Sequence, residues 1–128
     1  MTEQLDIDEA VRYLDAHAAG HSTGHCARSI RLALAAGGLR LTQHPALARQ
    51  YGDTLRTNGF SRITVTPAFV PAKGDIVVIQ NYEGGNVAGH VAMYSGREWL
   101  SDFRQRDMWS GPGYREHQPS YDIYRWTQ

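Results

Sequence analysis

The sequence predicts an α+β fold in which N-terminal helices pack on an antiparallel β-meander. In the first half of the chain, apolar residues recur at the spacing of a helix face. In the second half, short runs of β-branched and aromatic residues alternate with Gly and Pro, a pattern typical of strands and turns. The length of 128 residues is that of one domain, so we expect residues 1–128 to form a single unit with a buried core.

Three helices are expected in the first half. Asp6 is a suitable N-cap for the first helix, and Glu9 three residues later completes a capping box. Ile7, Val11 and Leu14 then share one face of this helix, which predicts that it packs on a core along that side.

A glycine pair separates the second predicted helix from the third. The second helix is expected over residues 24–36, capped by Ser22 or Thr23 and ended by the "GG" that follows it. The third is expected over residues 44–59, with Pro45 in its first turn, where the missing N–H of proline is not needed.

Strands and turns account for the second half. Strands are predicted at residues 62–65, 75–80, 90–94, 98–103 and 121–126. The segment between the last two, residues 104–119, is a long loop that carries Trp109 and Tyr114. Ordered loops of this length are often functional, so these two aromatic residues are candidate ligands for a substrate as well as candidate core residues.

Composition and charge exclude several classes of function. The 13 Lys and Arg residues balance the 13 Asp and Glu residues, so there is no basic excess for nucleic acid or an anionic membrane surface. No apolar run approaches the roughly 20 residues that span a bilayer. The segment "MTEQLDIDEAVRYL" is acidic and amphipathic and lacks the features of a secretory signal peptide, so we expect a cytoplasmic location in the producing cell.

Cys26 is the only cysteine, so it cannot form an internal disulfide. Its predicted place in the first turn of a helix matters chemically, because unpaired N–H groups there favour the thiolate and stabilise an oxyanion beside the sulfur. The alternatives are a small core residue and a metal ligand acting with His21 and His25. No second Cys/His cluster completes a metal site, so no metal or other cofactor is expected.

His90 is the candidate base for this thiol, because it begins a strand that follows the glycine-rich loop "EGGNVAG". A three-residue hairpin loop, "SGR", would place Tyr94 opposite Glu98 and His90 opposite Asp102. The Asp102 carboxylate would then orient the imidazole toward the thiol. A two-residue loop would instead place Ser101 opposite His90.

Four segments in this order resemble the papain-like cysteine amidases of the NlpC and CHAP type, which cut amide bonds in bacterial cell-wall peptides. The segments are "GHCARSIRLAL", "PAKGDIVVI", "GHVAMYSG" and "WLSDF", and the resemblance covers about residues 20–103. It implies a papain-like fold and a Cys-His-Asp mechanism that needs no metal or organic cofactor. Cys26, His90 and Asp102 occupy the family's positions for the nucleophile, the base and the orienting residue.

Within that group the chain is most similar to amidase effectors that bacteria inject through type VI secretion. The similarity rests on the small stand-alone domain, the absence of a signal peptide and the tail "SDFRQRDMWSGPGYR". It implies an antibacterial toxin that is delivered to the target-cell periplasm, acts on peptidoglycan peptides and has a cognate immunity protein as its partner.

Substrate contacts are predicted from the chemistry of the stem peptides. Because these peptides carry carboxylates, Arg104 is a candidate ligand, together with His25, Trp109 and Tyr114. Arg28 is instead expected to be a solvated surface charge. Three other functions stay open, namely a housekeeping or phage cell-wall hydrolase, another cysteine acyl-transfer enzyme on the same fold, and a non-catalytic binding domain in which the cysteine is structural.

Overall fold

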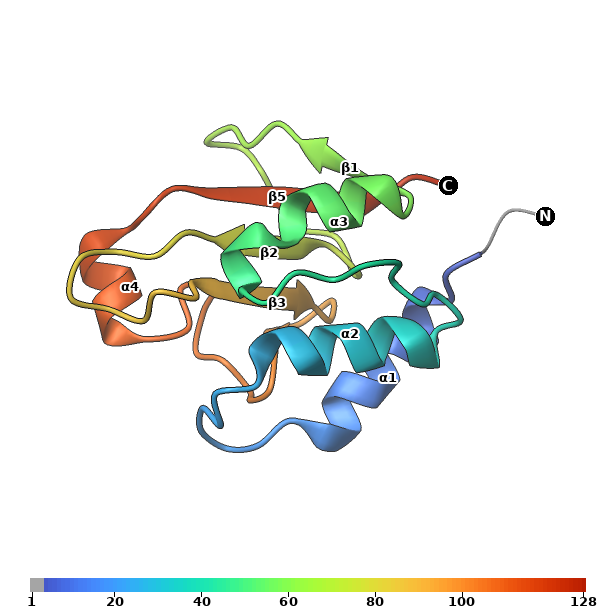
Figure 1. The fold of residues 1–128 in the computed structure, drawn as a ribbon, viewed down its shortest axis with the longest axis horizontal. Helices are drawn as coiled ribbons and strands as arrows, with labels where there is room; N and C mark the ends of the chain where they lie inside the picture. The colour runs from blue at the N-terminus through green and yellow to red at the C-terminus, as the bar shows by residue number, and fades with distance from the viewer. Residues whose placement is uncertain (1–3) are drawn as a thin grey trace.

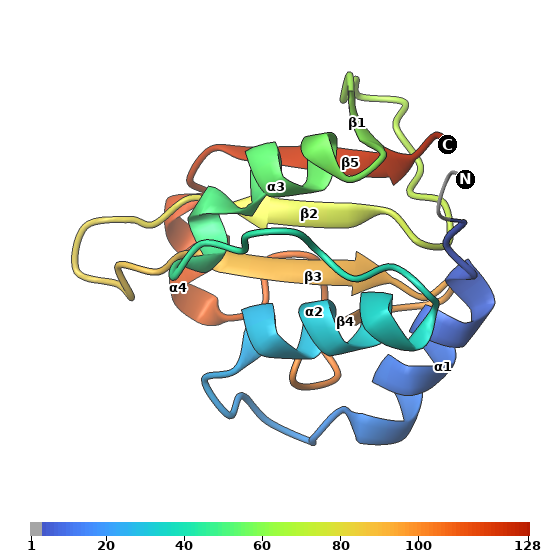
Figure 2. The same ribbon diagram turned by 45° about the vertical axis from the view of Figure 1, so that its right-hand side comes forward.

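A five-stranded antiparallel sheet forms the centre of the computed structural model, which describes residues 4–128. Three helices cover one face of this sheet, and a fourth, short helix lies at one end of the molecule (Figures 1 and 2). The helical elements are α1 (Ile7–His17), α2 (Cys26–Ala36), the 3₁₀ turn η1 (Ala48–Gln50), α3 (Tyr51–Thr57) and α4 (Pro112–His117). The strands are β1 (Phe60–Ile63), β2 (Ile76–Ile79), β3 (His90–Tyr94), β4 (Trp99–Leu100) and β5 (Tyr121–Trp126).

The strand order in the sheet is β1-β5-β2-β3-β4. The strands β2, β3 and β4 form the predicted meander, whereas β5 returns from the C-terminal part of the chain and pairs with both β1 and β2. The α+β prediction is therefore confirmed, with one strand inserted into the meander.

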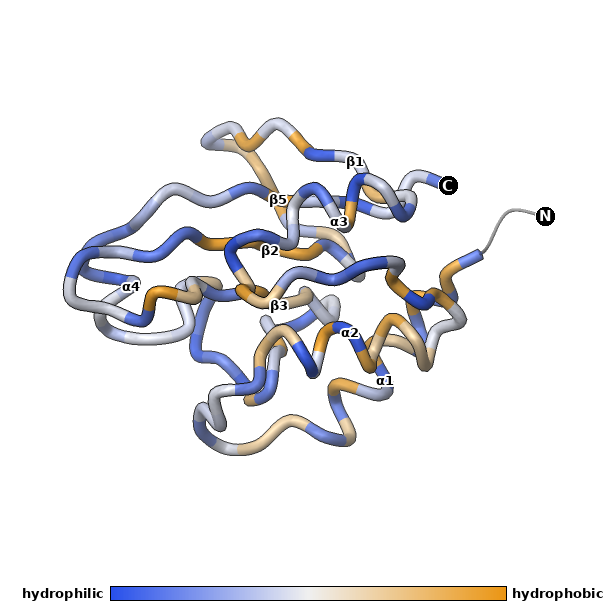
Figure 3. Tube along the Cα trace, in the orientation of Figure 1, coloured by the Kyte–Doolittle hydropathy of each residue, from blue (hydrophilic) through white to orange (hydrophobic). Residues whose placement is uncertain are grey.

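Both faces of the sheet are buried. Along β2, Ile76 and Val78 pack with the helices, whereas Val77 and Ile79 belong to a second apolar cluster on the opposite face. Figure 3 shows the apolar colouring of β2 within the sheet. Alternate strand residues point to opposite faces, so a strand that is apolar at every position indicates a sheet covered on both sides. The face opposite the helices is covered by the chain that follows β4.

The helix predictions hold best for α1 and α2. Asp6 caps α1, and its Oδ1 accepts a hydrogen bond of 3.1 Å from the N–H of Glu9. The predicted caps of α2 are wrong, because His25 occupies the N-cap position and the Thr23 side chain donates to Asp102 instead. Among residues 4–128, no helix is long and apolar enough to cross a membrane.

The third helix is shorter than predicted. Residues 44–47 are irregular, and the helical path begins with η1 and continues into α3. Gln43 has a φ of 52°, a left-handed conformation that interrupts the chain just before Pro45. Pro45 therefore lies in the irregular segment that leads to η1 and does not start a helix.

The hairpin between β3 and β4 differs from the predicted register. The N–H of Ser95 donates to the carbonyl of Glu98 at 2.9 Å, so the connection consists only of Gly96 and Arg97. Gly96 has a φ of 101°, which suits the first position of such a tight turn. Tyr94 is thus paired with Trp99 rather than with Glu98. A slip of one residue reverses the face of every following side chain, so His90 and Asp102 are not opposite each other. Ser101, the partner expected for a two-residue loop, is not paired with His90 either, because β4 ends at Leu100.

Candidate active site

The starts of α2 and β3 lie at the same end of the molecule, next to α4 (Figure 1). Cys26 is the first residue of α2, which starts two residues later than predicted, and His90 is the first residue of β3, as the sequence predicts. Both line a cleft of about 360 Å³, together with Asp102, Tyr82 and Tyr114. The backbone of Val91 also lies close enough to the thiol to lower its pKa. The fold therefore brings the predicted nucleophile and base into one site.

The imidazole of His90 is held by Gln105. Its Nε2 lies 2.6 Å from Oε1 of Gln105, and both residues are buried, at 7% and 5% exposure. The amide nitrogen of Gln105 donates to the carbonyls of Asp107 and Met108, at 2.9 and 3.4 Å. These two acceptors fix the orientation of the amide, so its oxygen faces the ring and Nε2 carries the hydrogen. Nδ1 is then the nitrogen that is able to accept a proton.

Asp102 makes different contacts from those predicted. Its Oδ2 accepts hydrogen bonds from the N–H and the hydroxyl of Thr23, at 2.6 and 3.0 Å, and a longer one of 3.5 Å from the N–H of His25. The predicted hydrogen bond between Asp102 and His90 is therefore replaced by the bond between His90 and Gln105. Asp102 instead fixes the loop that leads into Cys26, and it still lines the cleft.

Burial controls the ionisation of the thiol. Desolvation raises the pKa of Cys26 above its usual value of 9.0, although a hydrogen bond from the backbone of Val91 opposes the shift. The negative charge of Asp102 raises this pKa further, and the backbone of the first turn of α2 lowers it slightly. Near neutral pH the resting residue is consequently a thiol rather than a thiolate.

Burial also controls the ionisation of the His90 imidazole. Desolvation lowers the pKa of His90 below its usual value of 6.5, while the hydrogen bond with Gln105 and the charge of Asp102 act in the opposite direction. The ring is therefore neutral near pH 7. A neutral thiol beside a neutral imidazole is suited to general-base catalysis, in which the proton moves as the sulfur attacks.

The carboxyl group of Asp102 stays ionised in this environment. Burial alone would raise its pKa, but the hydrogen bonds to the carboxylate, of which those from Thr23 are the strongest, together outweigh burial and leave the pKa of Asp102 below the usual value of 3.8. A fixed negative charge thus lies near both Cys26 and His90.

Gly89 allows the chain to enter β3 at the right place for His90. It has a φ of 67°, and a Cβ atom at this position would collide with the carbonyl oxygen of Ile79 and with the side chain of Arg49. Arg49 in turn holds this loop, because its backbone N–H donates to the carbonyl of Ala88 at 2.8 Å and its Nε donates to the carbonyl of Val87 at 2.9 Å. Glycine is required here by both conformation and space.

Aromatic residues close the cleft on the side of α4. The Tyr114 ring lies 6.1 Å from the His90 ring, and burial raises the pKa of Tyr114 to about 12. Tyr82 packs edge-on against Tyr114 at 5.0 Å and stacks on His117 at 4.6 Å. The structure therefore places Tyr114 in the cleft, where the sequence predicts a substrate contact, and adds Tyr82, which the sequence does not single out.

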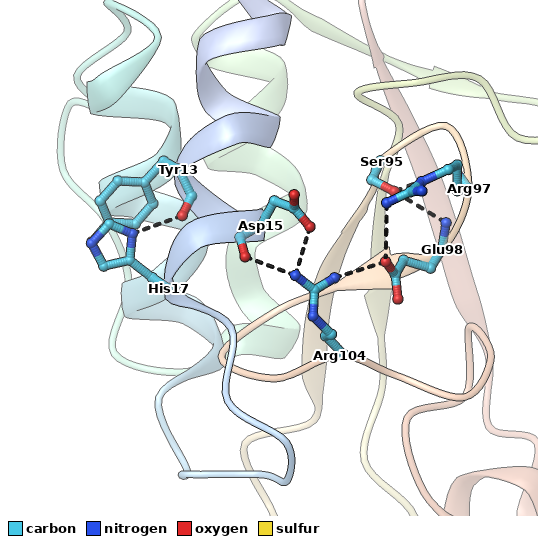
Figure 4. Close-up of polar contacts among 7 residues, drawn as sticks. All are labelled: Tyr13, Asp15, His17, Ser95, Arg97, Glu98 and Arg104. Atoms are coloured by element: carbon cyan, nitrogen blue, oxygen red, sulfur yellow. Dashed lines mark hydrogen bonds and ion pairs between the residues drawn. The ribbon is translucent and has the colours of Figure 1, made fainter.

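Arg104 lies outside the clefts around Cys26. Its guanidinium group donates to Asp15 Oδ1 at 2.7 Å, to the Asp15 carbonyl at 2.8 Å and to Glu98 Oε2 at 2.8 Å (Figure 4). These bonds connect the end of α1 with the β3–β4 hairpin. The structure therefore gives Arg104 a structural position rather than the predicted substrate-binding one.

Trp109 also lies away from the cleft lining. It packs against the second apolar cluster, and its ring meets that of Tyr121 edge-on at 5.4 Å. This is the core position that the sequence leaves open as the alternative to substrate binding. His25, by contrast, lines a neighbouring cleft that also contains Cys26.

Gln105 is the functional candidate that the sequence analysis misses. It lies in irregular chain, where no periodic pattern indicates the direction of a side chain. The one sequence feature that could indicate Gln105 is its position as a polar residue shortly after the strand that pairs with β3. Asp102 has the same feature, so the sequence does not distinguish the two residues. Within residues 4–128 there is no group of three or more His, Cys, Asp or Glu residues arranged to hold a metal ion.

The fold and this cleft define a papain-like α+β protein with a thiol and an imidazole grouped in one site. No protein-family model and no curated protein sequence matches the chain. It is similar to the crystal structure of the native type VI effector-immunity complex Tae3-Tai3 from Ralstonia pickettii, with 36% identity, a TM-score of 0.85 and coverage of 94% of this chain and 98% of that chain. The selenomethionine form of the complex gives 36% identity, a TM-score of 0.82 and coverage of 91% and 99%. The chain therefore belongs to the Tae3 family of type VI effectors.

Proposed function

We propose that this protein is a cysteine amidase that cleaves an amide bond in peptidoglycan peptides and acts as an antibacterial type VI effector. Membership of the Tae3 family supports the effector role and peptidoglycan as the target. The observation that carries the chemistry is the bond between His90 and Gln105, since it leaves Nδ1 of a buried imidazole as a base in the cleft that contains Cys26.

The reaction begins with a neutral thiol. Nδ1 of His90 accepts the proton of Cys26 as the sulfur attacks the carbonyl carbon of the amide, forming a tetrahedral oxyanion. Because Cys26 is the first residue of α2, the unpaired N–H groups at the start of this helix are near the sulfur and stabilise this oxyanion. His90 then donates its proton to the leaving amine, and a thioester remains. Water, deprotonated by His90, hydrolyses the thioester to a carboxylic acid and restores the thiol.

Two further residues support the catalytic dyad of Cys26 and His90 in different ways. Gln105 holds the ring orientation and the tautomer of His90 through a neutral hydrogen bond. Asp102 supplies a negative charge that favours the imidazolium formed during the attack, and it fixes the loop before Cys26. The Cys-His-Asp mechanism implied by the family resemblance is thus extended to a dyad with two supporting residues, one of which is the predicted Asp102.

The partner and the place of action follow from the same proposal. The related solved structures are effector-immunity complexes. We expect a cognate immunity protein that covers the cleft around Cys26, and delivery of the protein to the periplasm of a target cell, where peptidoglycan is accessible. His25 and Tyr114 are the predicted residues in position to contact the bound peptide.

Digestion of purified sacculi tests the enzymatic proposal. The wild-type protein should release new muropeptide ends, identified by mass spectrometry, and Cys26→Ala should reduce the rate by several orders of magnitude while its melting temperature changes little. Ser29→Ala is a suitable control on the same helix, because Ser29 does not line the clefts on either side of the thiol. Near-normal digestion by Cys26→Ala would refute the cysteine mechanism.

Expression in two compartments tests the effector proposal. Cytoplasmic expression in a Gram-negative host should be tolerated, whereas fusion to a periplasmic signal peptide should cause lysis that Cys26→Ala abolishes. Healthy growth with active, periplasmic wild-type protein would contradict the toxin role.

A further inference from the structure

A second cleft adjoins the first at Cys26. It has a volume of about 470 Å³ and shares Gly24, Cys26 and Ala88 with the cleft that contains His90. Its walls come from the first turns of α2 and from the segment that leads through η1 into α3, which runs alongside α2 in both ribbon views (Figures 1 and 2). Cys26 therefore lies where the two clefts meet, and a bound peptide that crosses this residue has room in both clefts.

The charged residues in the lining of this second cleft are all basic. They are Arg28 and Arg31, and no Asp or Glu contributes to the lining, which also contains the polar side chains of His25 and His44. Arg28 and Arg31 are three residues apart on α2, a spacing that places both on one side of the helix. The cleft with His90 has the opposite character, since Asp102 is its charged residue and Tyr82 and Tyr114 form much of its wall.

The two arginines have no acidic partner within residues 4–128. The ion pairs of this part of the chain engage other cations, such as Arg115 with Asp107 and Arg125 with Asp75. The side-chain hydrogen bonds of the described residues also leave Arg28 and Arg31 uncommitted, whereas Arg104 is held by Asp15 and Glu98. An arginine without a partner in a cleft retains its full capacity for a bidentate bond to a carboxylate.

Tyr51 and several small residues form another part of the lining, beside the basic residues. The Tyr51 side chain is only 1% exposed and lies in the cleft lining. Burial raises the pKa of Tyr51, and the positive charge of Arg31 opposes this shift. The remaining lining includes small residues such as Ala46 and Ala48, which leave room for a substituent beside the cations.

We propose that this cleft is a subsite for a free carboxylate of the substrate peptide, and that Arg28 and Arg31 bind it. The proposal rests on the proposed function. It adds that the substrate must carry a free carboxylate next to the bond that the enzyme cleaves. It also changes the role expected for Arg28, which the sequence alone assigns to solvent. The carboxylate would lie on the side of the thiol away from His90, and it would place the scissile carbonyl over the sulfur.

The first test measures the charge of the cleft with two small reagents and does not depend on peptidoglycan. Cys26 is the only cysteine, so its alkylation by iodoacetate or by neutral iodoacetamide can be followed by intact mass. In the double variant Arg28→Gln/Arg31→Gln, the ratio of the iodoacetate rate to the iodoacetamide rate should fall about three- to tenfold, and added salt should reduce the ratio of the wild type. Arg40→Gln, which removes an exposed charge outside the cleft, should leave the ratio unchanged. An equal ratio in the wild type and the double variant would overturn the anion site.

The second test measures the substrate role. For unmodified muropeptides the double variant should raise KM about tenfold or more with a smaller change in kcat, and amidation of the muropeptide carboxylates should reduce kcat/KM of the wild type but not of the double variant. An unchanged KM in the double variant would overturn the subsite even if the alkylation ratio falls. If the wild type digests no muropeptide at all, the proposed function fails together with this substrate role, whereas a retained iodoacetate preference still supports an anion-binding cleft.

Discussion

Cys26 and His90 lie at the starts of two regular elements, whereas the residues that act on them lie in an irregular segment. The first turn of α2 and the first residue of β3 set the positions of the sulfur and the ring. Gln105 and Asp102 come from the chain that turns back after β4. The regular region thus positions the reacting atoms, and the irregular region sets the tautomer of the ring and the charge around both groups.

The irregular segment is fixed by backbone hydrogen bonds despite its lack of periodicity. The N–H of Ala19 donates to the carbonyl of Asp102 at 2.9 Å, and the N–H of Arg104 donates to the carbonyl of Ala19 at 3.0 Å. The N–H of Gln105 donates to the carbonyl of Trp99 at 3.0 Å. A segment anchored on both sides in this way holds a side chain as firmly as a strand does, which is what orientation of a catalytic base requires.

Among changes in the irregular segment, removal of the amide that holds His90 is expected to have the largest effect on turnover. Gln105→Leu has a similar size but cannot accept from Nε2, so kcat should fall about 100-fold because the ring loses its orientation and tautomer. Nitrogen chemical shifts of the His90 ring should show Nε2–H in the wild type and a mixture of tautomers in the variant. Full turnover of Gln105→Leu with an unchanged ring spectrum would show that the irregular segment does not control the base.

Asp102→Asn should have a smaller effect on turnover and a measurable effect on stability. The variant keeps an acceptor for Thr23 but loses the charge, so unfolding at pH 7 should require about 1 to 2 kcal/mol less free energy. Because the folded pKa of Asp102 is depressed, this contribution is present above the unfolded value near 3.8 and is lost as the pH falls through the folded pKa. Urea denaturation at pH 7 and near pH 3 should therefore show a difference between wild type and variant that shrinks with acid.

The Asp102→Asn variant also distinguishes an electrostatic role of Asp102 from a purely structural one. Removing the negative charge should lower the pKa of Cys26 and also that of His90, since Asp102 raises both. The pH dependence of iodoacetamide alkylation and a titration of the His90 ring measure the two shifts. If Asp102→Asn is less stable but the pKa values of Cys26 and His90 are unchanged, the only role of Asp102 is to hold the loop before Cys26.

The pH profile of the wild type compares the two reacting groups directly. Since the pKa of His90 is lowered, kcat/KM should stay high as the pH falls to 6.5 and should decline only below it, where the ring becomes protonated. Since the pKa of Cys26 is raised, alkylation of the free enzyme should increase steeply only near and above pH 9. A fast alkylation rate that is constant through mildly acidic pH would instead indicate a preformed thiolate-imidazolium pair.

Arg104→Gln is expected to have the smallest effect. The side chain is partly exposed and its bonds to Asp15 and Glu98 lie at the surface, so the melting temperature should drop only slightly, and less in high salt (Figure 4). Neither kcat nor KM should change, because Arg104 does not line the clefts beside Cys26. A large rise in KM would restore the substrate role that the sequence suggests.

The regular part of the fold and the positions of Cys26 and His90 follow from the sequence. Apolar periodicity predicts α1 and α2, and continuous apolar runs predict β2 and β3, because these elements are buried along a face or on both sides. Cys26 and His90 are predictable because each begins such an element. The third helix is misplaced because Pro45 is equally suited to an irregular segment and to a first helical turn.

The partner of His90 does not follow from the sequence, for two physical reasons. The turn of the β3–β4 hairpin is centred on Gly96 and Arg97, so Tyr94 pairs with Trp99 rather than with Glu98, and this shift of one residue changes which side chains face each other. Beyond Leu100 the chain leaves the ladder, so the direction of Gln105 depends on backbone contacts with Ala19 and Trp99 that have no local sequence signature. The same chain reversal brings Asp102 to Thr23.

The inner position of β5 has a consequence for synthesis of the protein on the ribosome. β1 and β2 are joined only through β5, so the sheet stays open until residues 121–126 have emerged and can insert between them. Tyr114, which closes the cleft, is also made shortly before that point. A nascent chain thus carries the Cys26 thiol long before it carries an assembled cleft, and the timing of translation itself delays the appearance of a competent site.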